Sequence, residues 1–255
     1  MVYNFCSLFL LFLSYSIIGY LVEITSVSLT EKKIVLNRGF LIGPYLPIYG
    51  FGAICMIMFL EKYQHDILAL FVMGVVICTI LEYLTSLIME KIFKLRWWDY
   101  SHKRFNINGR VCLENGVLFG LGGVFIVKVV NPLISGVIYW FPSWLTIVLG
   151  IFLLLVFIAD IVESAYITFK LKINVNNYVK QDATAEIKKE IMKALQKNTT
   201  LTTRLLKAFP NIRHEASKNF VEFKKLVYKA KEDAIERKKQ RKRKLARLQK
   251  KKNSN

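Results

Sequence analysis

Apolar residues are grouped into long, nearly uncharged blocks that short polar connections separate. A transmembrane helix needs about 20 predominantly apolar residues to cross the hydrocarbon core of a bilayer. Five blocks of about this length occur before residue 170, at residues 3–23, 40–60, 67–89, 111–130 and 143–169. The pattern therefore predicts an all-α, polytopic membrane helix bundle with about five transmembrane helices.

The uncharged run over residues 129–159 is too long for a single span. Pro132 and Pro142 interrupt it, and proline breaks a helix because it lacks an N–H donor and clashes with the preceding turn. We therefore predict an exterior turn that ends at Pro142, with the fifth helix beginning at Ser143. A shallow re-entrant piece over residues 133–141 fits the same pattern.

Charge divides the chain into two very different parts. Residues 1–169 contain 11 Lys and Arg against 10 Asp and Glu, whereas residues 170–255 contain 26 against 8. We interpret the first part as a membrane domain and the second as a basic cytosolic tail. Good helix formers and few breakers predict that the tail is helical, with an interruption at Pro210.

The basic tail is compatible with three roles. It can be a solvated surface that only reinforces topology, or it can bind anionic lipid headgroups, to which each basic residue adds about 1 kcal/mol. RNA binding rests on charge alone, because the aromatic residues of the tail precede its densest charge at residues 238–252. Nucleic acid is therefore not a favoured partner.

The positions of Lys and Arg predict the orientation, because cytoplasmic loops of membrane proteins are enriched in these residues. The first connection between spans carries three of them and the third carries six, whereas the second carries only Lys62 and the fourth carries none. We expect a multi-pass protein of the plasma membrane with the N-terminus outside and the C-terminus in the cytoplasm.

A weak internal similarity relates residues 1–60 to residues 67–130. For example, Tyr49-Gly-Phe-Gly aligns with Phe119-Gly-Leu-Gly. Either the first helix hairpin is duplicated as the second, or two apolar segments resemble each other by chance. A true repeat favours a site at the interface between the two hairpins, as in transporters built from repeats.

Charged residues inside the spans are the most unusual feature of the membrane domain. Acidic groups in hydrocarbon are costly, and they usually face the bundle interior with a partner. Under the orientation above, Glu82 is the deepest of a set in the cytoplasmic half, which either forms ion pairs that only fix helix packing or lines a polar cavity open to the cytoplasm. The set comprises Glu23, Asn37, Arg38, Glu82, Glu90, Arg96, Asp99, Asn106, Asn108, Arg110 and Glu114.

The start of the second span is rich in residues that disturb a helix. Prolines remove backbone donors and free carbonyl groups, which membrane proteins tolerate where the break is buried or lines a cavity. The segment is either a broken helix whose carbonyls could coordinate a ligand, or a kinked helix whose glycines admit a close neighbour. The residues concerned are Gly39, Gly43, Pro44, Pro47, Tyr49 and Gly50.

Two adjacent tryptophans, Trp97 and Trp98, follow the third span together with Tyr100. Aromatic residues at the end of a span usually anchor it at the membrane interface. Because Arg96 and Asp99 bracket them, they could also form the floor of a headgroup or substrate pocket.

Other kinds of chemistry find little support. The four cysteines are scattered singly and the three histidines are far apart, so we predict neither a disulfide framework nor a metal site. No Walker A loop or common hydrolase motif is present, and we expect no cofactor.

Several long motifs resemble the bacterial ABC transporter permease family of type IV, CmpB-like, over about residues 5–134. They are Asn37-Arg-Gly-Phe-Leu-Ile-Gly-Pro-Tyr-Leu-Pro-Ile-Tyr-Gly, Leu81-Glu-Tyr-Leu-Thr-Ser, Arg96-Trp-Trp-Asp-Tyr-Ser and Phe105-Asn-Ile-Asn-Gly-Arg-Val-Cys-Leu-Glu. The resemblance implies the membrane subunit of a transporter, which would need an ATPase subunit from another chain.

We therefore expect a permease-like or transport-associated protein with a cytoplasm-facing polar cavity. Two alternatives belong to other classes: a membrane-embedded enzyme that acts on lipid headgroups, and a scaffold that recruits partners or anionic lipid through its basic tail.

Overall fold

The computed structural model describes residues 4–180 except Lys33 and Asn37, and single residues and short runs between 204 and 240. Its elements are α1 (Phe5–Glu31), α2 (Pro47–Leu60), η1 (Glu61–Tyr63), α3 (Ile67–Phe93), β1 (Leu95–Arg96), β2 (Asn106–Ile107), β3 (Val111–Cys112), α4 (Leu113–Phe125), the π-helical turn η2 (Ile126–Val130), α5 (Asn131–Trp140), α6 (Ser143–Lys180) and β4 (Arg213–His214). The all-α membrane bundle predicted from the sequence is confirmed. Most of the predicted helical tail lies outside the described residues.

Four helical stretches are long and apolar enough to cross a membrane, over residues 5–30, 67–93, 113–140 and 143–173. The second predicted span differs, because its helix α2 has 14 residues and begins only at Pro47. At about 1.5 Å per residue such a helix is shorter than the roughly 30 Å hydrocarbon core. A non-helical segment, residues 38–46, precedes it, and with this segment the count of about five agrees with the prediction.

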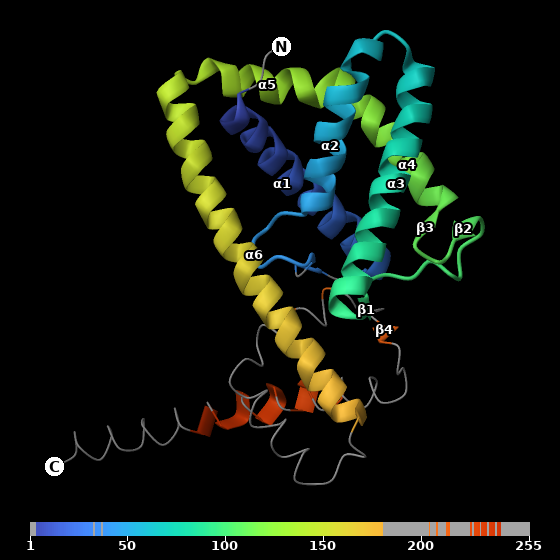
Figure 1. Ribbon diagram of the computed structural model, residues 1–255, viewed down its shortest axis with the longest axis vertical. Helices are drawn as coiled ribbons and strands as arrows, with labels where there is room; N and C mark the ends of the chain where they lie inside the picture. Colours follow the sequence, from blue (N-terminus) through green and yellow to red (C-terminus); the bar gives the residue numbers. More distant parts are fainter. Residues whose placement is uncertain are drawn as a thin grey trace, which may run out of the picture.

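The two ends of the bundle carry different connections (Figure 1). The beginning of α1, the α2–α3 turn and α5 lie at one end, which we call the N-terminal end. The α1–α2 connection, β1, β4 and the last turns of α6 lie at the opposite end, which we call the C-terminal end. Helix α5 lies across the N-terminal end, and the exterior turn expected there is confined to Phe141 and Pro142, where the helix stops before Ser143.

Close helix approach organises the bundle on both sides. The most extensive contact joins α3 to α4, and the next joins α1 to α2. A Cβ atom on Gly74 of α3 would lie 3.5 Å from the Cα of Gly120 on α4. In α2, a Cβ atom on Gly50 would lie 2.6 Å from the carbonyl oxygen of Phe12 on α1. Small residues let membrane helices approach until backbones nearly touch.

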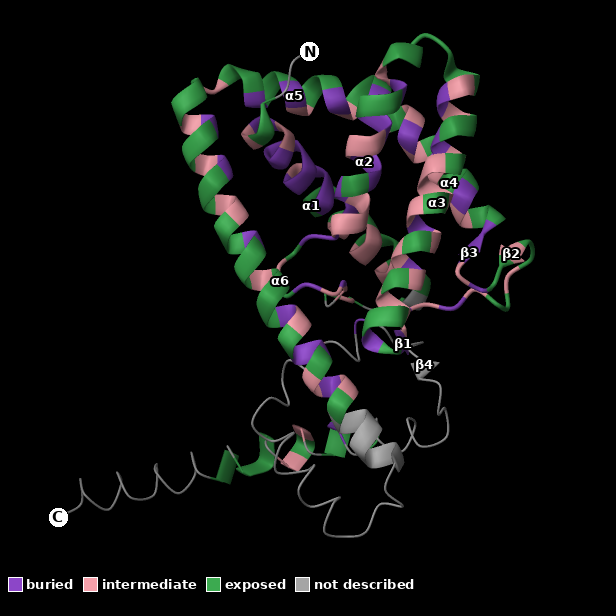
Figure 2. Cartoon of the chain, in the orientation of Figure 1, coloured by how far each residue is buried: buried purple, intermediate pink, exposed green. Residues whose placement is uncertain are grey.

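The apolar core lies around α1, and α6 closes one side of it. Phe9, Phe12 and Leu13 of α1 pack against Tyr45 and Phe157. Figure 2 shows that buried positions run along α1, whereas most of the surface of α6 is exposed. Exposed apolar side chains of α6, such as Leu155 and Val162, are 63% accessible. In a bilayer this face is suited to contact lipid chains.

Candidate functional site

Glu82 is a buried carboxylate in the middle of α3, with 5% of its surface exposed. The hydroxyl of Tyr100 donates a hydrogen bond to Glu82 Oε1 at 3.3 Å, and the amide of Asn115 on α4 also hydrogen-bonds to this carboxylate. Both partners are neutral. Among the described residues, no ion pair joins Glu82 to a basic side chain within 4.0 Å.

Glu23 of α1 lies in a different electrostatic setting. Arg38, in the non-helical segment before α2, forms an ion pair with Glu23 Oε1 at 2.8 Å. The hydroxyl of Tyr49 on α2 donates to the other carboxylate oxygen at 3.0 Å. The charge of Glu23 is therefore compensated, and its second oxygen is held by a neutral donor.

These two acidic residues belong to a single cluster. Glu23 and Glu82 interact electrostatically with each other, and Tyr49 interacts with both of them and with Tyr100. The members come from α1, α2, α3, α4 and the two connections at the C-terminal end. We call them the central polar cluster: Glu23, Arg38, Tyr49, Glu82, Tyr100 and Asn115.

Tyr100 supplies its hydrogen bond from outside the membrane-spanning helices. Burial raises the pKa of this phenol, and the nearby negative charge of Glu82 raises it further. Burial and a neighbouring anion both disfavour the phenolate. Tyr100 therefore remains protonated over the physiological pH range and can act as a donor to Glu82.

A second group of charges lies closer to the C-terminal end. Glu90 Oε2 is 2.6 Å from the guanidinium of Arg110 and 3.7 Å from that of Arg96. Arg96 is also 3.9 Å from Asp99, and Arg110 donates to the hydroxyl of Ser86 at 3.1 Å. This group is a network of ion pairs that joins α3 to the connection over residues 94–112.

Asn106 and Asn108 shape that connection. The strands β2 and β3 form a short hairpin, in which Asn108 and Gly109 have positive φ angles of 53° and 65°. The side-chain oxygen of Asn106 accepts a hydrogen bond from Gly109 N at 3.0 Å. The amide of Asn108 donates to the hydroxyl of Tyr83 at 3.0 Å. Both asparagines therefore position the loop that carries Tyr100, since they fix its turn and its contact with α3.

The structure separates the two tryptophans. Trp97 is 2% exposed and packs edge-on against Phe40 and Phe93, with ring centroids 5.6 and 6.1 Å away. It is a core residue at this end of the bundle, and the interfacial-anchor interpretation of these aromatic residues stays a prediction. The indole N–H of Trp98 donates to the carbonyl oxygen of Arg110 at 2.9 Å. Trp97 therefore joins the 94–112 connection to the bundle, and Trp98 closes the connection on itself.

One predicted cavity residue, Glu114, joins neither the central polar cluster nor the second group of charges. Glu114 is a surface residue, because its carboxylate is 65% exposed and pairs with Lys103 at 2.8 Å. Its neighbour Asn115 turns toward α3 instead, and the sequence reasoning missed it. The signal was present, since the polar pair Glu114-Asn115 opens α4. Asn37 lies outside the described residues.

The non-helical segment before α2 is held through its backbone. Gly39 adopts φ +90°, a conformation that favours glycine. The carboxylate of Asp160, on α6, accepts hydrogen bonds from Ile42 N at 2.8 Å and Gly43 N at 2.7 Å. It also accepts one from the hydroxyl of Tyr45 at 2.5 Å. Successive backbone N–H groups make such a concave anion site, and here an internal carboxylate occupies it.

The sequence left open whether the freed carbonyls of this segment could coordinate a ligand. The guanidinium of Arg204 donates to the carbonyl oxygens of Leu41 and Ile42. These two carbonyls therefore already have a protein partner. Within the described residues, no group of three or more His, Cys, Asp or Glu side chains is arranged to hold a metal ion.

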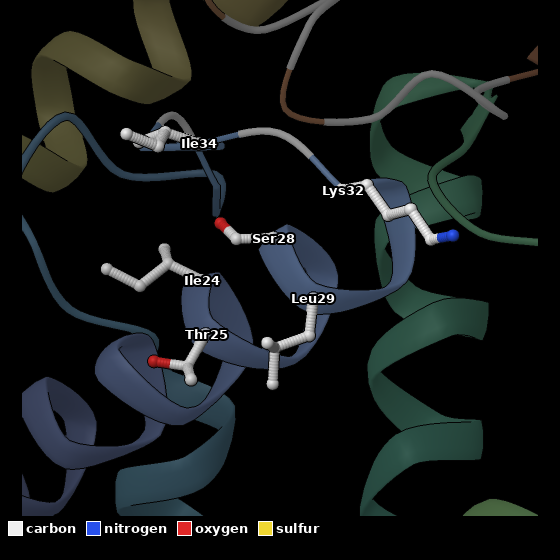
Figure 3. A pocket seen from close by; sticks show the side chains of 6 residues that line it. All are labelled: Ile24, Thr25, Ser28, Leu29, Lys32 and Ile34. Atoms are coloured by element: carbon white, nitrogen blue, oxygen red, sulfur yellow. The ribbon is translucent and has the colours of Figure 1, made fainter.

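Two hollows in the described part of the chain lie away from the central polar cluster. One, of about 420 Å³, lies beside the last turns of α1, and its six lining residues include Ser28 and Lys32 (Figure 3). The other, of about 600 Å³, lies beside α4 near Lys103 and Glu114. Neither hollow is lined by Glu82. With 5% of its surface exposed, Glu82 is shielded from solvent, and in this sense the cluster is closed around Glu82 in this structure.

The fold defines a multi-pass helical membrane protein in which charged residues are buried between helices. A family described as "Putative ABC-transporter type IV" matches residues 10–165, which is more than half of the 255 residues. The chain belongs to this family, as the resemblance of its motifs indicated, and it is a membrane protein associated with transport. Neither the curated proteins nor the solved structures contain a significant match to the chain.

Proposed function

We propose that the protein is the membrane subunit of a transporter whose central polar cluster forms part of the solute pathway. The single observation that carries this proposal is the setting of Glu82. It is a carboxylate 5% exposed in the middle of a membrane-spanning helix, and its hydrogen-bond partners are neutral. Such residues are costly to maintain in a membrane and usually mark substrate or ion pathways.

Helix packing alone accounts less well for this arrangement. A packing role is best served by an ion pair, and Glu23 has one in Arg38. Glu82 instead faces phenol and amide groups from two other elements, Tyr100 and Asn115. A site at the meeting point of two helix hairpins can open when the hairpins move relative to each other. The closed cluster would then be one state of an alternating-access cycle.

The proposal places the C-terminal end of the bundle in the cytoplasm. The basic connections and the basic tail support this orientation, because Lys and Arg are enriched on the cytoplasmic side. The α1 start lies at the opposite end (Figure 1), so the N-terminus is outside in this proposal. The basic tail then lies next to the inner leaflet, where it can bind anionic lipid headgroups.

The energy source in this proposal is a separate ATPase subunit. The family supports such a partner by its description, and the 255 residues contain no Walker A loop. The test is purification of the full chain from its native membranes in mild detergent, followed by mass spectrometry. A co-purifying nucleotide-binding subunit supports the partnership, whereas its consistent absence contradicts it.

The experiment that tests the site compares a deletion strain complemented with wild type, Glu82→Gln or Glu163→Gln. Glu163 is the matched control, because it is an exposed acidic residue in α6. Small molecules in cells and medium are quantified by untargeted mass spectrometry. We expect wild type and Glu163→Gln to restore the same solute distribution and Glu82→Gln to fail. Equal restoration by all three would contradict a role for Glu82 in transport.

The same strains distinguish the alternative functions. A lipid-headgroup enzyme would change the phospholipid headgroup profile of the deletion strain, with solute distribution following only as a consequence. A scaffold that acts through its basic tail would lose activity when residues 215–255 are removed, whereas a transporter would largely keep it. The transport proposal expects an unchanged headgroup profile.

A further inference from the structure

Two described tail residues contact the non-helical segment before α2. The guanidinium of Arg204 donates to the carbonyl oxygens of Leu41 and Ile42, the latter at 3.2 Å. Ala208 is fully buried, and its carbonyl oxygen accepts a hydrogen bond from Arg38 at 2.8 Å. Hydrogen bonds therefore run in both directions. A tail side chain donates to backbone carbonyls of the membrane domain, and a side chain of the membrane domain donates to a backbone carbonyl of the tail.

A third attachment joins the tail to the other polar connection. Strand β4 pairs antiparallel with β1, with Leu95 opposite His214 and Arg96 opposite Arg213. Strand β1 directly follows α3 and belongs to the connection that carries Tyr100. The same stretch of tail is thus attached to both connections that contribute to the central polar cluster.

Opposite charges hold the segment over residues 38–46 on two sides. Asp160 of α6 accepts hydrogen bonds from its N–H groups, and Arg204 donates to its C=O groups. Asp160 and Arg204 also attract each other electrostatically. Leu41 is 2% exposed, and a buried carbonyl group needs a hydrogen-bond partner. Loss of Arg204 would therefore leave the carbonyl of Leu41 without the donor it has here.

Arg38 connects this attachment to the central polar cluster. One of its guanidinium nitrogens binds the carbonyl oxygen of Ala208, and another binds the carboxylate of Glu23. We propose that the tail residues Arg204, Ala208, Arg213 and His214 form an intramolecular latch that holds the 38–46 segment in place and keeps the central polar cluster closed at its C-terminal end. Its meaning for transport rests on the function proposed above.

Hydrogen exchange measured by mass spectrometry tests the latch without a transport assay. The full chain is placed in lipid nanodiscs, and peptides covering residues 38–46 are followed in wild type, Arg204→Gln and Lys239→Gln. Lys239 is the matched control, because it is an exposed tail residue with the same charge. We expect Arg204→Gln to accelerate exchange in this segment about tenfold, as loss of a charge-assisted hydrogen bond implies. Lys239→Gln should leave it unchanged.

Exchange in α3 and α4 shows whether the variant is still folded. If Arg204→Gln also accelerates exchange there, the variant has loosened the whole bundle, and Arg213→Pro is measured instead. This variant disrupts the β1–β4 pairing from the tail side and alters no residue of the membrane domain. We expect this variant to accelerate exchange over residues 94–98 and 38–46. Unchanged exchange in both segments would overturn the latch, even if the transport assay above succeeds.

Discussion

The hydroxyl of Tyr100 reaches the carboxylate of Glu82 at 3.3 Å, although Tyr100 lies in a connection and Glu82 in the middle of α3. The contact requires the 94–112 connection to fold back against the bundle. Asn108 holds it there through its bond to Tyr83 of α3, while Asn106 and Trp98 make bonds within the connection that set its shape. A loop outside the spans thereby provides a partner to a carboxylate inside one.

The first prediction concerns the stability of Glu82→Gln. Removing a buried charge that lacks a basic partner relieves its desolvation cost, and the amide keeps an oxygen for Tyr100. We expect the thermal unfolding midpoint in detergent to stay the same or to rise, while function is lost. Exposed Glu163→Gln should leave both unchanged. A fall in the midpoint of several degrees in Glu82→Gln alone would indicate that Glu82 serves packing.

The second prediction concerns alkaline pH. Because the pKa of Tyr100 in the folded protein is raised above the ordinary value of 10.0, the folded state holds this proton more tightly than the unfolded state. The resulting stability is fully present below pH 10.0 and is lost as the pH rises toward the folded pKa. Thermal midpoints measured from pH 8 to 11 (roughly the accessible range around the unperturbed value) should fall more steeply in wild type than in Tyr100→Phe. The same pH dependence of the thermal midpoint in wild type and Tyr100→Phe would contradict a raised pKa of Tyr100.

The third prediction compares two ion pairs. The side chains of Glu23 and Arg38 are 29% and 19% exposed, so Arg38→Gln leaves a partly buried carboxylate unpaired and should cost about 1–3 kcal/mol of stability. The pair of Lys103 with Glu114, whose carboxylate is 65% exposed, should contribute no more than about 1 kcal/mol. Double-mutant cycles with glutamine measure both coupling energies. Equal couplings would count against a special role for Arg38.

The fourth prediction concerns Asp160. Asp160→Ala removes the charged acceptor of Ile42 N, Gly43 N and the Tyr45 hydroxyl, and should destabilise the protein by about 1–3 kcal/mol because three donors, two of them partly buried, lose this partner. Glu163→Ala, on the same helix but exposed, should have little effect. Thermal unfolding with tryptophan fluorescence measures the difference. Similar midpoints for the two variants would show that the segment finds other acceptors.

The apolar blocks of the chain were enough to predict the membrane bundle and the approximate positions of its spans. A helix needs a minimum number of consecutive apolar residues to cross a bilayer. This number can be counted in the sequence without knowing any tertiary contact. Pro142 likewise locates the start of α6, because proline restricts the backbone locally, whereas the start of α2 at Pro47 differs from the predicted span over residues 40–60. The acidic residues of the spans were also recognisable, because charge is rare there.

Which of these residues contact one another depends on how the helices pack. Glu114 and Asn115 are adjacent in the sequence, yet one is exposed and the other reaches Glu82. Trp97 is buried, and the partners of the 38–46 segment, Asp160 and Arg204, come from more than 100 residues away in the chain. Such pairings depend on the rotation and relative position of whole helices. Packing of the complete bundle sets these quantities, and no local pattern along the chain encodes them.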